Sequence, residues 1–384
     1  MAKNLLIVYG GSSTEHDVSV VTALQIFKKY NLEGVDVKLV YIDREDNWYM
    51  GEALESFKFY KNVNLTKLKK VKLDVGSNML FTVKGIGRGK KLFEVDFVIN
   101  CCHGGYGEAG DLSSLLEMCK IPTSTGDTTS LKLAMDKYMT KMLSIALDIP
   151  TVDFFSIDRR EWQTIKHKLA EQIEQFGYPV IVKPARQGSS VGVCMASTFI
   201  EFEKAVNLAL QFDERVIVER AIVNKREFNC CLIKKNERVL ASSIEEPISS
   251  DVIITFNDKY LGGENDAKAL KGGAKMSNCR GLGMDNAERK IPADIPTKLK
   301  NEIIKYAKTM YSALDMCGVV RVDFIMDNET NKVYLGEINS IPGSLGYYFW
   351  GDLNLLEILY ESGKCYWKSR FLRQKSTPKA KIFS

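Results

Sequence analysis

Four polar side chains near the end of the chain are spaced so that they would lie on one face of a β-hairpin. Apolar and polar residues alternate on both sides of a turn at residues 327–331, which predicts two strands. The alternation places Arg321 and Asp323 on one face of the first strand, and Glu337 and Asn339 share a face of the second. Such a cluster is costly to bury unless it binds something, and its oxygen atoms suit Mg²⁺ shared with phosphate. On these residues alone, the solvated face of an ordinary hairpin is an equally good interpretation.

A lysine followed by a loop of small residues is the second feature that could do chemistry. An apolar run ends at Lys183, and the loop after it contains Gly188, Ser189, Ser190 and Gly192. Backbone N–H groups of such a loop can surround phosphate oxygens, and a lysine supplies the compact charge that a triphosphate needs. The loop by itself is typical of plain connections, but the preceding strand and lysine favour phosphate binding.

Further polar residues would lie at the ends of strands. Glu219 closes the short strand that begins at Arg215, and backbone groups beside an acid can read a purine edge, although this pattern is weak by itself. Glycines after the first strand place Glu15 and His16 at the carboxyl end of a sheet, where ligands of open α/β sheets bind. His103 comes to the same edge, and a structural hydrogen bond is the preferred interpretation of a lone histidine there.

The order of the secondary-structure elements predicts an α/β fold that could position these residues. A strand at residues 4–9, a glycine turn, a helix at 20–29 and a strand at 37–42 form a βαβ unit, so the N-terminal third should be a parallel sheet. Later segments predict an antiparallel sheet, which makes the rest of the chain α+β. The later helices are expected at 137–146, 162–176 and 297–314.

The whole chain has the composition of a soluble globular protein. Its 384 residues suffice for two or three cores, and 45% are apolar and 26% charged. The net charge of +5 is mild and implies no nucleic-acid partner. None of the nine cysteines forms a CxxC pair, which favours buried thiols in a reducing cytoplasm over disulfides or zinc. No run approaches the ~18 apolar residues of a membrane span, so we expect a cytoplasmic protein without membrane contact.

Two segments lack a core-facing pattern. Residues 256–290 contain six glycines, several lysines and few apolar residues, which indicates either disorder or a functional lid. Residues 368–381 contain six lysines and arginines and no acid, which is typical of a solvated extension, with contact to an anionic partner as the alternative.

Eight motifs, spread in one order over nearly the whole chain, resemble the D-alanine–D-alanine ligase family of ATP-grasp ligases. They are GGSSTEHDVS, HGGYGEAG, AMDK, VKPARQGSSVGV, VIVER with REF, DKYL, IPADIP, and RVDF with GEINSIPG. The resemblance implies an ATP-grasp fold in which an N-terminal parallel α/β domain, residues 1–134, and two α+β domains enclose ATP. The other domains would be a central one at 135–222 and a C-terminal catalytic one at 223–366 with the lid at 256–290, followed by a basic tail at 367–384.

The same resemblance implies ATP as co-substrate and two Mg²⁺ or Mn²⁺ ions. Two lysines would hold the phosphates, an acid with the backbone after it would bind adenine, and a second acid would bind the ribose. The expected ATP-binding residues are Lys137, Lys183, Ser189, Ser190, Glu219, Arg220, Ile222, Glu227 and Lys259. The expected metal ligands are Asp323, Glu337 and Asn339, with Glu337 bridging both ions.

The resemblance also assigns roles toward the two amino-acid substrates. Glu15 would hold the amino group of the first D-amino acid, and Arg321 with a backbone N–H would stabilise an oxyanion. The expected catalytic residues are Glu15, Ser189, Tyr260, Arg321 and Gly343, and the expected substrate-binding residues are Glu15, His103, Ser344 and Tyr348.

One segment departs from the family pattern. In the family, a serine a few residues after the proline–glycine pair usually binds the carboxylate of the second substrate, but this chain reads PGSLGYYFW there. Ser344, from a different place, or Tyr348 would take that role.

The leading prediction is ATP-dependent joining of two D-alanines through an acyl phosphate, for peptidoglycan precursor synthesis, by a homodimer. The alternatives are ligation of D-alanine to another acceptor such as D-serine, another amino-acid ligation, or a nucleotide-binding regulator without turnover.

Overall fold

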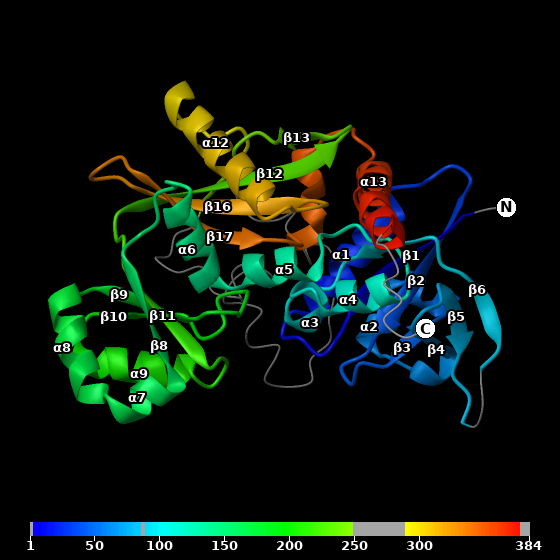
Figure 1. Cartoon of the computed structure of the whole chain (residues 1–384), viewed down its shortest axis with the longest axis horizontal. Helices are drawn as coiled ribbons and strands as arrows, with labels where there is room; N and C mark the ends of the chain where they lie inside the picture. The colour runs from blue at the N-terminus through cyan, green and yellow to red at the C-terminus, as the bar shows by residue number, and fades with distance from the viewer. Residues whose placement is uncertain (1–2, 86–88, 249–288, 377–384) are drawn as a thin grey trace, which may run out of the picture.

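The computed structural model of the chain describes residues 3–85, 89–248 and 289–376, with side chains up to residue 372. Its strands form three large sheets, which Figure 1 shows with the blue strands at the right, the green β8–β11 group at the lower left and the orange hairpin above. Lys259, Tyr260 and all but the last two residues of the predicted lid lie outside the described residues. Within the described ranges, no helix is both long and apolar enough to cross a membrane.

The first sheet is mixed, whereas the sequence predicted a parallel one. Only β2, β1 and β7 run parallel, and β3 to β6 continue the sheet as antiparallel strands. Residues 43–47 alone join β2 to β3, which is too short for a parallel crossover, so the next strand must turn back. The strands, in spatial order, are β6 (Lys91–Glu94), β5 (Met79–Thr82), β4 (Lys69–Leu73), β3 (Trp48–Met50), β2 (Val35–Ile42), β1 (Lys3–Gly10) and β7 (Phe97–Asn100).

Helices cover both faces of β1, the middle one of the three parallel strands. Leu5, Ile7 and Tyr9 of β1 pack in a core with α1 (His16–Lys29), whereas Leu6 and Val8 pack with α4 (Asp111–Met118) on the other side. Alternation therefore buries both faces, as in other sheets with parallel strands. Short elements complete the region: η1 (Glu52–Glu55), α2 (Phe57–Lys61), η2 (Leu65–Lys67) and α3 (Gly105–Glu108).

The second sheet is antiparallel and has helices of its own. Its order is β10 (Cys194–Ala196), β9 (Val180–Pro184), β11 (Arg215–Arg220) and β8 (Phe154–Asp158). The single helix predicted at 162–176 is two, α7 (Arg159–Thr164) and α8 (Lys166–Phe176), because the backbone leaves helical geometry at Ile165. Trp162 and Leu169 still pack in one core with α9 (Phe199–Ala209).

The third sheet contains the predicted hairpin, which is confirmed. It has the order β13 (Arg238–Ala241), β12 (Lys225–Lys235), β16 (Val320–Asp327) and β17 (Val333–Asn339), and α12 (Thr297–Ala313) packs on it. A small sheet of β14 (Glu246–Pro247) and β15 (Arg289–Lys290) lies beside it. Two helices that precede the second sheet in sequence, α5 (Thr128–Met135) and α6 (Lys137–Ala146), also contact β17. The expected domain boundary at residue 134 therefore falls within α5.

The end of the described chain returns to the first sheet. The turn η4 (Gly343–Phe349) and helix α13 (Leu355–Ser376) share a core with β1 and α1, and Figure 1 shows α13 in red beside them. Trp367 is fully buried, and its Nε1 donates to the carbonyl oxygen of Thr123 at 2.9 Å. Helix α13 continues through residues 368–376, and Lys368, Ser369 and Leu372 on it are exposed, so the predicted solvated extension begins as a helix.

Most of the described cysteines are core residues. Eight are free thiols, and six of them are buried: Cys101, Cys102, Cys119, Cys230, Cys231 and Cys317. Burial raises the pKa of the Cys230 thiol to about 12, so this thiol stays protonated. The prediction of buried thiols is confirmed for these six.

Replacing Trp367 tests whether α13 is part of the folded core. Trp367→Ala should lower the free energy of unfolding by about 3–5 kcal/mol, because it leaves a cavity and an unpaired carbonyl oxygen at Thr123. Leu372→Ala, on the same helix but 55% exposed, should change it by less than about 0.5 kcal/mol. Urea denaturation of both variants measures the difference, and equal effects would contradict the packing of α13.

Candidate active site

The hairpin presents its four polar residues on one face. The guanidinium of Arg321 donates to both carboxylate oxygens of Asp323, each at 2.7 Å. Nδ2 of Asn339 donates to Oδ2 of Asp323 at 2.9 Å, and Glu337 is the register partner of Asp323 on β17. The Arg321 side chain is only 11% exposed, so this two-point pairing is what allows its charge to lie at the edge of the core.

A cleft between the second and third sheets collects most of the predicted ATP-binding residues. Its lining includes apolar residues from both sheets, among them Ile181, Met195 and Ile325. Two of the expected metal ligands, Asp323 and Glu337, line it as well. The expected ATP-binding residues in its lining are Lys137, Lys183, Ser190, Glu219, Arg220, Ile222 and Glu227.

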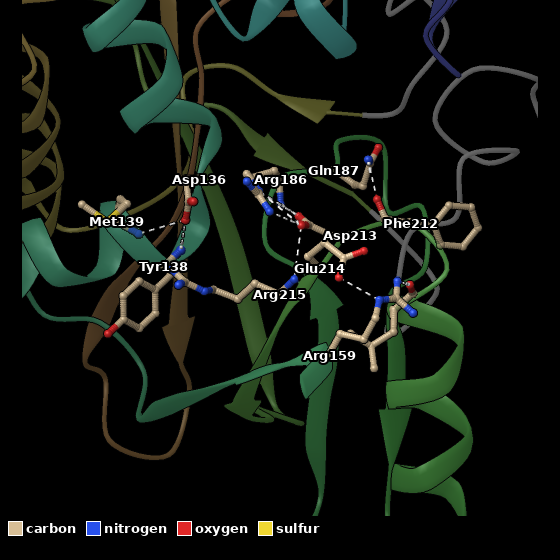
Figure 2. Close-up of polar contacts among 11 residues, drawn as sticks. Asp136, Tyr138, Met139, Arg159, Arg186, Gln187, Phe212, Asp213, Glu214 and Arg215 are labelled. Carbon is tan, nitrogen blue, oxygen red and sulfur yellow. Dashed lines mark hydrogen bonds and ion pairs between the residues drawn. The ribbon is translucent and has the colours of Figure 1, made fainter. Parts of the chain in front are cut away.

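Lys137 reaches the cleft because it is the first residue of α6. Asp136 caps this helix by accepting from the N–H groups of Tyr138 and Met139, at 3.0 and 3.1 Å (Figure 2). The Lys137 ammonium donates to the carbonyl oxygen of Gln187 at 2.6 Å and lies 3.8 Å from a Glu337 carboxylate oxygen. One lysine thus touches both the loop of small residues and the hairpin.

The loop after β9 is anchored at its start and bears strained residues at its tip. Figure 2 shows Arg186 paired with Asp213, whose carboxylate accepts from the Arg186 backbone N–H at 2.8 Å, and Gln187 donating to the carbonyl oxygen of Phe212. Ser189 and Ser190 follow with φ of +49° and +58°. Left-handed residues in tight turns can aim backbone N–H groups at an anion.

A buried carboxylate lies between two lysines on the wall of the cleft. Oε1 of Glu219 is 2.8 Å from the Lys183 ammonium and 3.0 Å from that of Lys141. Lys141 Nζ also donates to Thr151 Oγ1 at 2.8 Å. Burial would raise the pKa of Glu219, but Lys141 and then Lys183 outweigh it and bring the pKa to about 2. Glu219 is therefore ionised at neutral pH, and Lys183 is held at the cleft.

Glu15 lies where two glycine-containing loops meet. Its Oε1 accepts a hydrogen bond from Ser189 Oγ, so the loop that contains Glu15 and the small-residue loop after β9 are in direct contact. A Cβ on Gly104 would lie 2.6 Å from Oε2 of Glu15, and one on Gly188 would lie 2.7 Å from it. Only glycine allows both loops to approach this carboxylate so closely.

His103 is a buried hydrogen-bonding residue, as the preferred interpretation of a lone histidine predicted. Its Nε2 is 2.8 Å from Thr22 Oγ1, which in turn accepts from the backbone N–H of Ser344 at 3.0 Å. Burial and then Arg321 lower the pKa of His103 to about 3, so its ring is neutral. The chain from His103 to Ser344 ties α1 to η4 and so positions Gly343, the first residue of that turn.

The side chains of two predicted site residues bond to other parts of the protein and not to groups that line the cleft. Ser344 Oγ donates to Gln25 Oε1 at 2.6 Å and is buried against α1, away from the cleft lining. The Arg220 guanidinium donates to the carbonyl oxygen of Phe176 at 2.8 Å and pairs with Asp153 at 3.5 Å. Arg220 therefore adds backbone atoms rather than its charge to the cleft.

Family models match the chain on both sides of residue 134. The model described as "D-ala D-ala ligase N-terminus" matches residues 4–125, and "D-ala D-ala ligase C-terminus" matches residues 143–279 and 277–348. The chain belongs to the D-alanine–D-alanine ligase family. The ligase of Thermosipho melanesiensis that bears this family's name is 34% identical over 352 residues, 90% of this chain and 88% of that protein. The one of Clostridium acetobutylicum is 31% identical over 353 residues, 89% and 90% of the two chains.

Solved structures of this ligase family confirm the ATP-grasp fold. The D-alanine–D-alanine ligase of Helicobacter pylori covers 94% of this chain and 98% of its own, with a TM-score of 0.73 and 27% identity. The one of Coxiella burnetii covers 98% of both chains with a TM-score of 0.76 and 23% identity. A D-Ala:D-Ser ligase of Enterococcus faecalis has the same fold, with a TM-score of 0.72, 24% identity and coverage of 96% and 100%. The fold is thus shared by ligases whose names state different acceptors.

Sequence reasoning missed several residues of this candidate site. Lys141 is four residues after Lys137 on α6, so helical spacing alone would have placed both on one face. Thr22 and Glu108 carried no comparable signal. Glu108 accepts from the backbone N–H of Gly104 at 2.9 Å and of Ile341 at 3.3 Å, and burial and then Glu15 raise its pKa to about 7.

Removing Lys141 should leave Glu219 with one cation in place of two. We expect Lys141→Met to lower the free energy of unfolding at pH 7 by about 1–3 kcal/mol, and the added change Glu219→Gln to recover part of it. Since the pKa of Glu219 is lowered from 4.5 to about 2, its contribution is complete above pH 4.5 and is lost as the pH falls through 2. The difference between wild type and variant should shrink over that range.

Urea denaturation between pH 2 and 8 measures this coupling. Lys132→Met, which removes a lysine that is 53% exposed, is the control and should have an effect below about 0.5 kcal/mol. Strictly additive effects of Lys141→Met and Glu219→Gln would show that the two groups do not interact.

Proposed function

We propose that this protein is an ATP-dependent ligase that joins two D-alanines for peptidoglycan precursor synthesis. The observation that carries the proposal is the hydrogen bond from Ser189 to Glu15. It puts a loop suited to phosphate next to a carboxylate suited to the amino group of an amino acid. Phosphoryl transfer requires the phosphate site and the amino-acid site to be adjacent, because the γ-phosphoryl group of ATP and the amino acid's carboxylate must come within bonding distance.

ATP would lie in the cleft between the second and third sheets. The apolar lining at Ile181, Met195 and Ile325 suits a purine ring, and the polar lining at Glu227 suits a ribose hydroxyl. Lys137 and Lys183 would hold the phosphates under the loop with Ser190. Lys183 would leave Glu219 to do so, and Lys141 would keep that buried carboxylate paired.

The hairpin fits divalent metal ions. Asp323 and Glu337 are register partners at the cleft, and Asn339 adds an amide oxygen, which is the hard oxygen donor set that Mg²⁺ or Mn²⁺ takes when it is shared with phosphate. These three residues would hold two ions. Bound there, the ions would offset the negative charge of the triphosphate during transfer.

The residues around Glu15 would carry out the ligation. Glu15 would bind the donor's ammonium group, so that the donor carboxylate takes the γ-phosphoryl group of ATP to give an acyl phosphate and ADP. The acceptor's amine would then attack the carbonyl carbon, lose a proton and expel inorganic phosphate. Arg321 and the backbone N–H of Gly343 would stabilise the oxyanion of that step.

A ligase with another acceptor, such as D-serine, is the second candidate. The segment after the proline–glycine pair supports it, because Tyr347, Tyr348 and Phe349 stand near the position where the family usually has a serine for the acceptor's carboxylate. A homodimer and a cytoplasmic location stay predictions.

A coupled assay of ADP release tests the proposal directly. The protein with ATP and Mg²⁺ should release ADP when D-alanine is added, and mass spectrometry should detect the dipeptide. A panel of other D-amino acids, each mixed with D-alanine, identifies the preferred acceptor. Absence of ADP release with every D-amino acid would exclude D-amino acid ligase activity. A nucleotide-binding regulator without turnover would then be the remaining alternative.

Asp323→Asn tests the metal assignment. The variant keeps the shape of the side chain but removes a charge that would bind metal, so we expect turnover to fall by about 100-fold or more while the protein stays folded. Its melting temperature should be lower than that of the wild type, because Arg321 loses its charged partner. Asp327→Asn, in the turn of the same hairpin, is the matched control and should retain wild-type turnover. Equal turnover of wild type and Asp323→Asn would remove the metal assignment.

A further inference from the structure

Glu108 is a buried carboxylate to which the proposed reaction assigns no role. It ends α3, the short helix that follows Gly104, and only 7% of the residue is exposed. Burial and then the carboxylate of Glu15 raise its pKa to about 7. A carboxyl group in the core beside a second one is costly, so its presence indicates a function that an apolar side chain could not perform.

Both oxygens of this carboxylate accept hydrogen bonds, and the donors belong to two different segments. Oε2 accepts from the backbone N–H of Gly104 at 2.9 Å. Oε1 accepts from the backbone N–H of Ile341 and from Ser340 Oγ, both at 3.3 Å. Glu108 therefore connects the loop after β7 with the segment after β17, which lies more than two hundred residues later in the chain.

The loop after β7 lies against the carboxylate that is proposed to bind the donor's ammonium group. A Cβ on Gly104 would lie 2.6 Å from Oε2 of Glu15, so this backbone packs directly on the carboxylate. Ser13 Oγ donates to the carbonyl oxygen of His103 at 2.5 Å and accepts from the backbone N–H of Glu15 at 3.1 Å. The place of Glu15 is thus fixed relative to Gly104 by hydrogen bonds as well as by packing.

The segment after β17 leads to the backbone N–H that is proposed to stabilise the oxyanion. Ile341 is two residues before Gly343, and Ser340 and Ile341 are both buried. A hydrogen bond that fixes Ile341 therefore limits where the N–H of Gly343 can lie. Because it holds Gly104 and Ile341 at once, Glu108 fixes the separation between the ammonium site and the oxyanion site.

We infer that Glu108 is a positioning residue that makes the donor site specific for α-amino acids. The inference rests on the proposed ligase function and deepens it. An α-amino acid has one carbon atom between its nitrogen and its carboxyl carbon, whereas a β-amino acid has two. A donor whose ammonium group is bound at Glu15 presents its carbonyl oxygen to Gly343 only if this spacing matches the separation that Glu108 fixes. Without Glu108, longer donors should react.

Two donors that differ in this spacing test the inference. The full-length protein, with ATP and Mg²⁺, receives an equimolar mixture of D-alanine and β-alanine, and excess hydroxylamine replaces the acceptor. Hydroxylamine reacts with the acyl phosphate itself, so the donor half of the reaction is measured. The ratio of the two hydroxamates, measured by mass spectrometry, gives the ratio of the two kcat/KM values and does not depend on the amount of active protein.

Glu108→Gln and Glu108→Asp should each lower the ratio of D-alanine product to β-alanine product by about tenfold or more. Glutamine has one acceptor oxygen, and its amide N–H group would face the N–H of Gly104 or of Ile341. Aspartate keeps the charge but is one methylene too short to reach both N–H groups. Ser340→Ala removes a single hydrogen bond to Glu108 and should lower the ratio by about threefold.

A matched control and the outcomes separate this inference from the proposed function. Glu52→Gln makes the same change on an exposed glutamate of η1 and should leave the ratio as in wild type. A ratio within twofold of wild type in Glu108→Gln or Glu108→Asp overturns the inference, and so does the absence of β-alanine product from both variants. If neither variant folds, Ser340→Ala decides, and an unchanged ratio overturns the inference. If the wild-type protein forms no hydroxamate from D-alanine, the ligase function itself is overturned, and the role of Glu108 with it.

Discussion

The hydrogen bond between Ser189 and Glu15 joins two parts of the chain that have separate cores. Glu15 precedes α1 on the first sheet, and Ser189 is at the tip of the loop after β9 in the second. Glycine at positions 104 and 188 is the condition for this contact, since a Cβ at either position would lie within 2.7 Å of the Glu15 carboxylate. The site therefore depends on how closely two loops can approach one charged group.

Charge pairing is the second constraint on the site. Lys137, Lys183 and Arg321 are largely removed from water, and each lies near a carboxylate that offsets the cost of burying its charge. Lys183 shares its partner with Lys141, and this sharing has a consequence. If Lys183 turned toward a phosphate, Glu219 would still have one ammonium group, and no buried carboxylate would be left alone.

Local patterns predicted the features that depend on residues close in sequence. Alternation predicted the β16–β17 hairpin, and the spacing after a strand predicted Lys183 and its loop. Features that depend on distant packing were not predicted: the antiparallel half of the first sheet, the break at Ile165 and the helical course of α13. Trp367 shows the reason, because its burial against Thr123 depends on a contact across more than two hundred residues, which a basic local composition does not reveal.

The turn η4 is positioned by the same kind of distant contact. Ser344, Leu345 and Gly346 have φ of +54°, +48° and +57°, and left-handed geometry costs about 1–2 kcal/mol for each non-glycine residue. Burial of Leu345 in the core with α1 and the bonds from Ser344 to Thr22 and Gln25 offset that cost. These contacts fix the course of η4 and so the place of Tyr348. The course of η4 therefore depends on Thr22 and Gln25 of α1, which lie more than three hundred residues earlier in the chain.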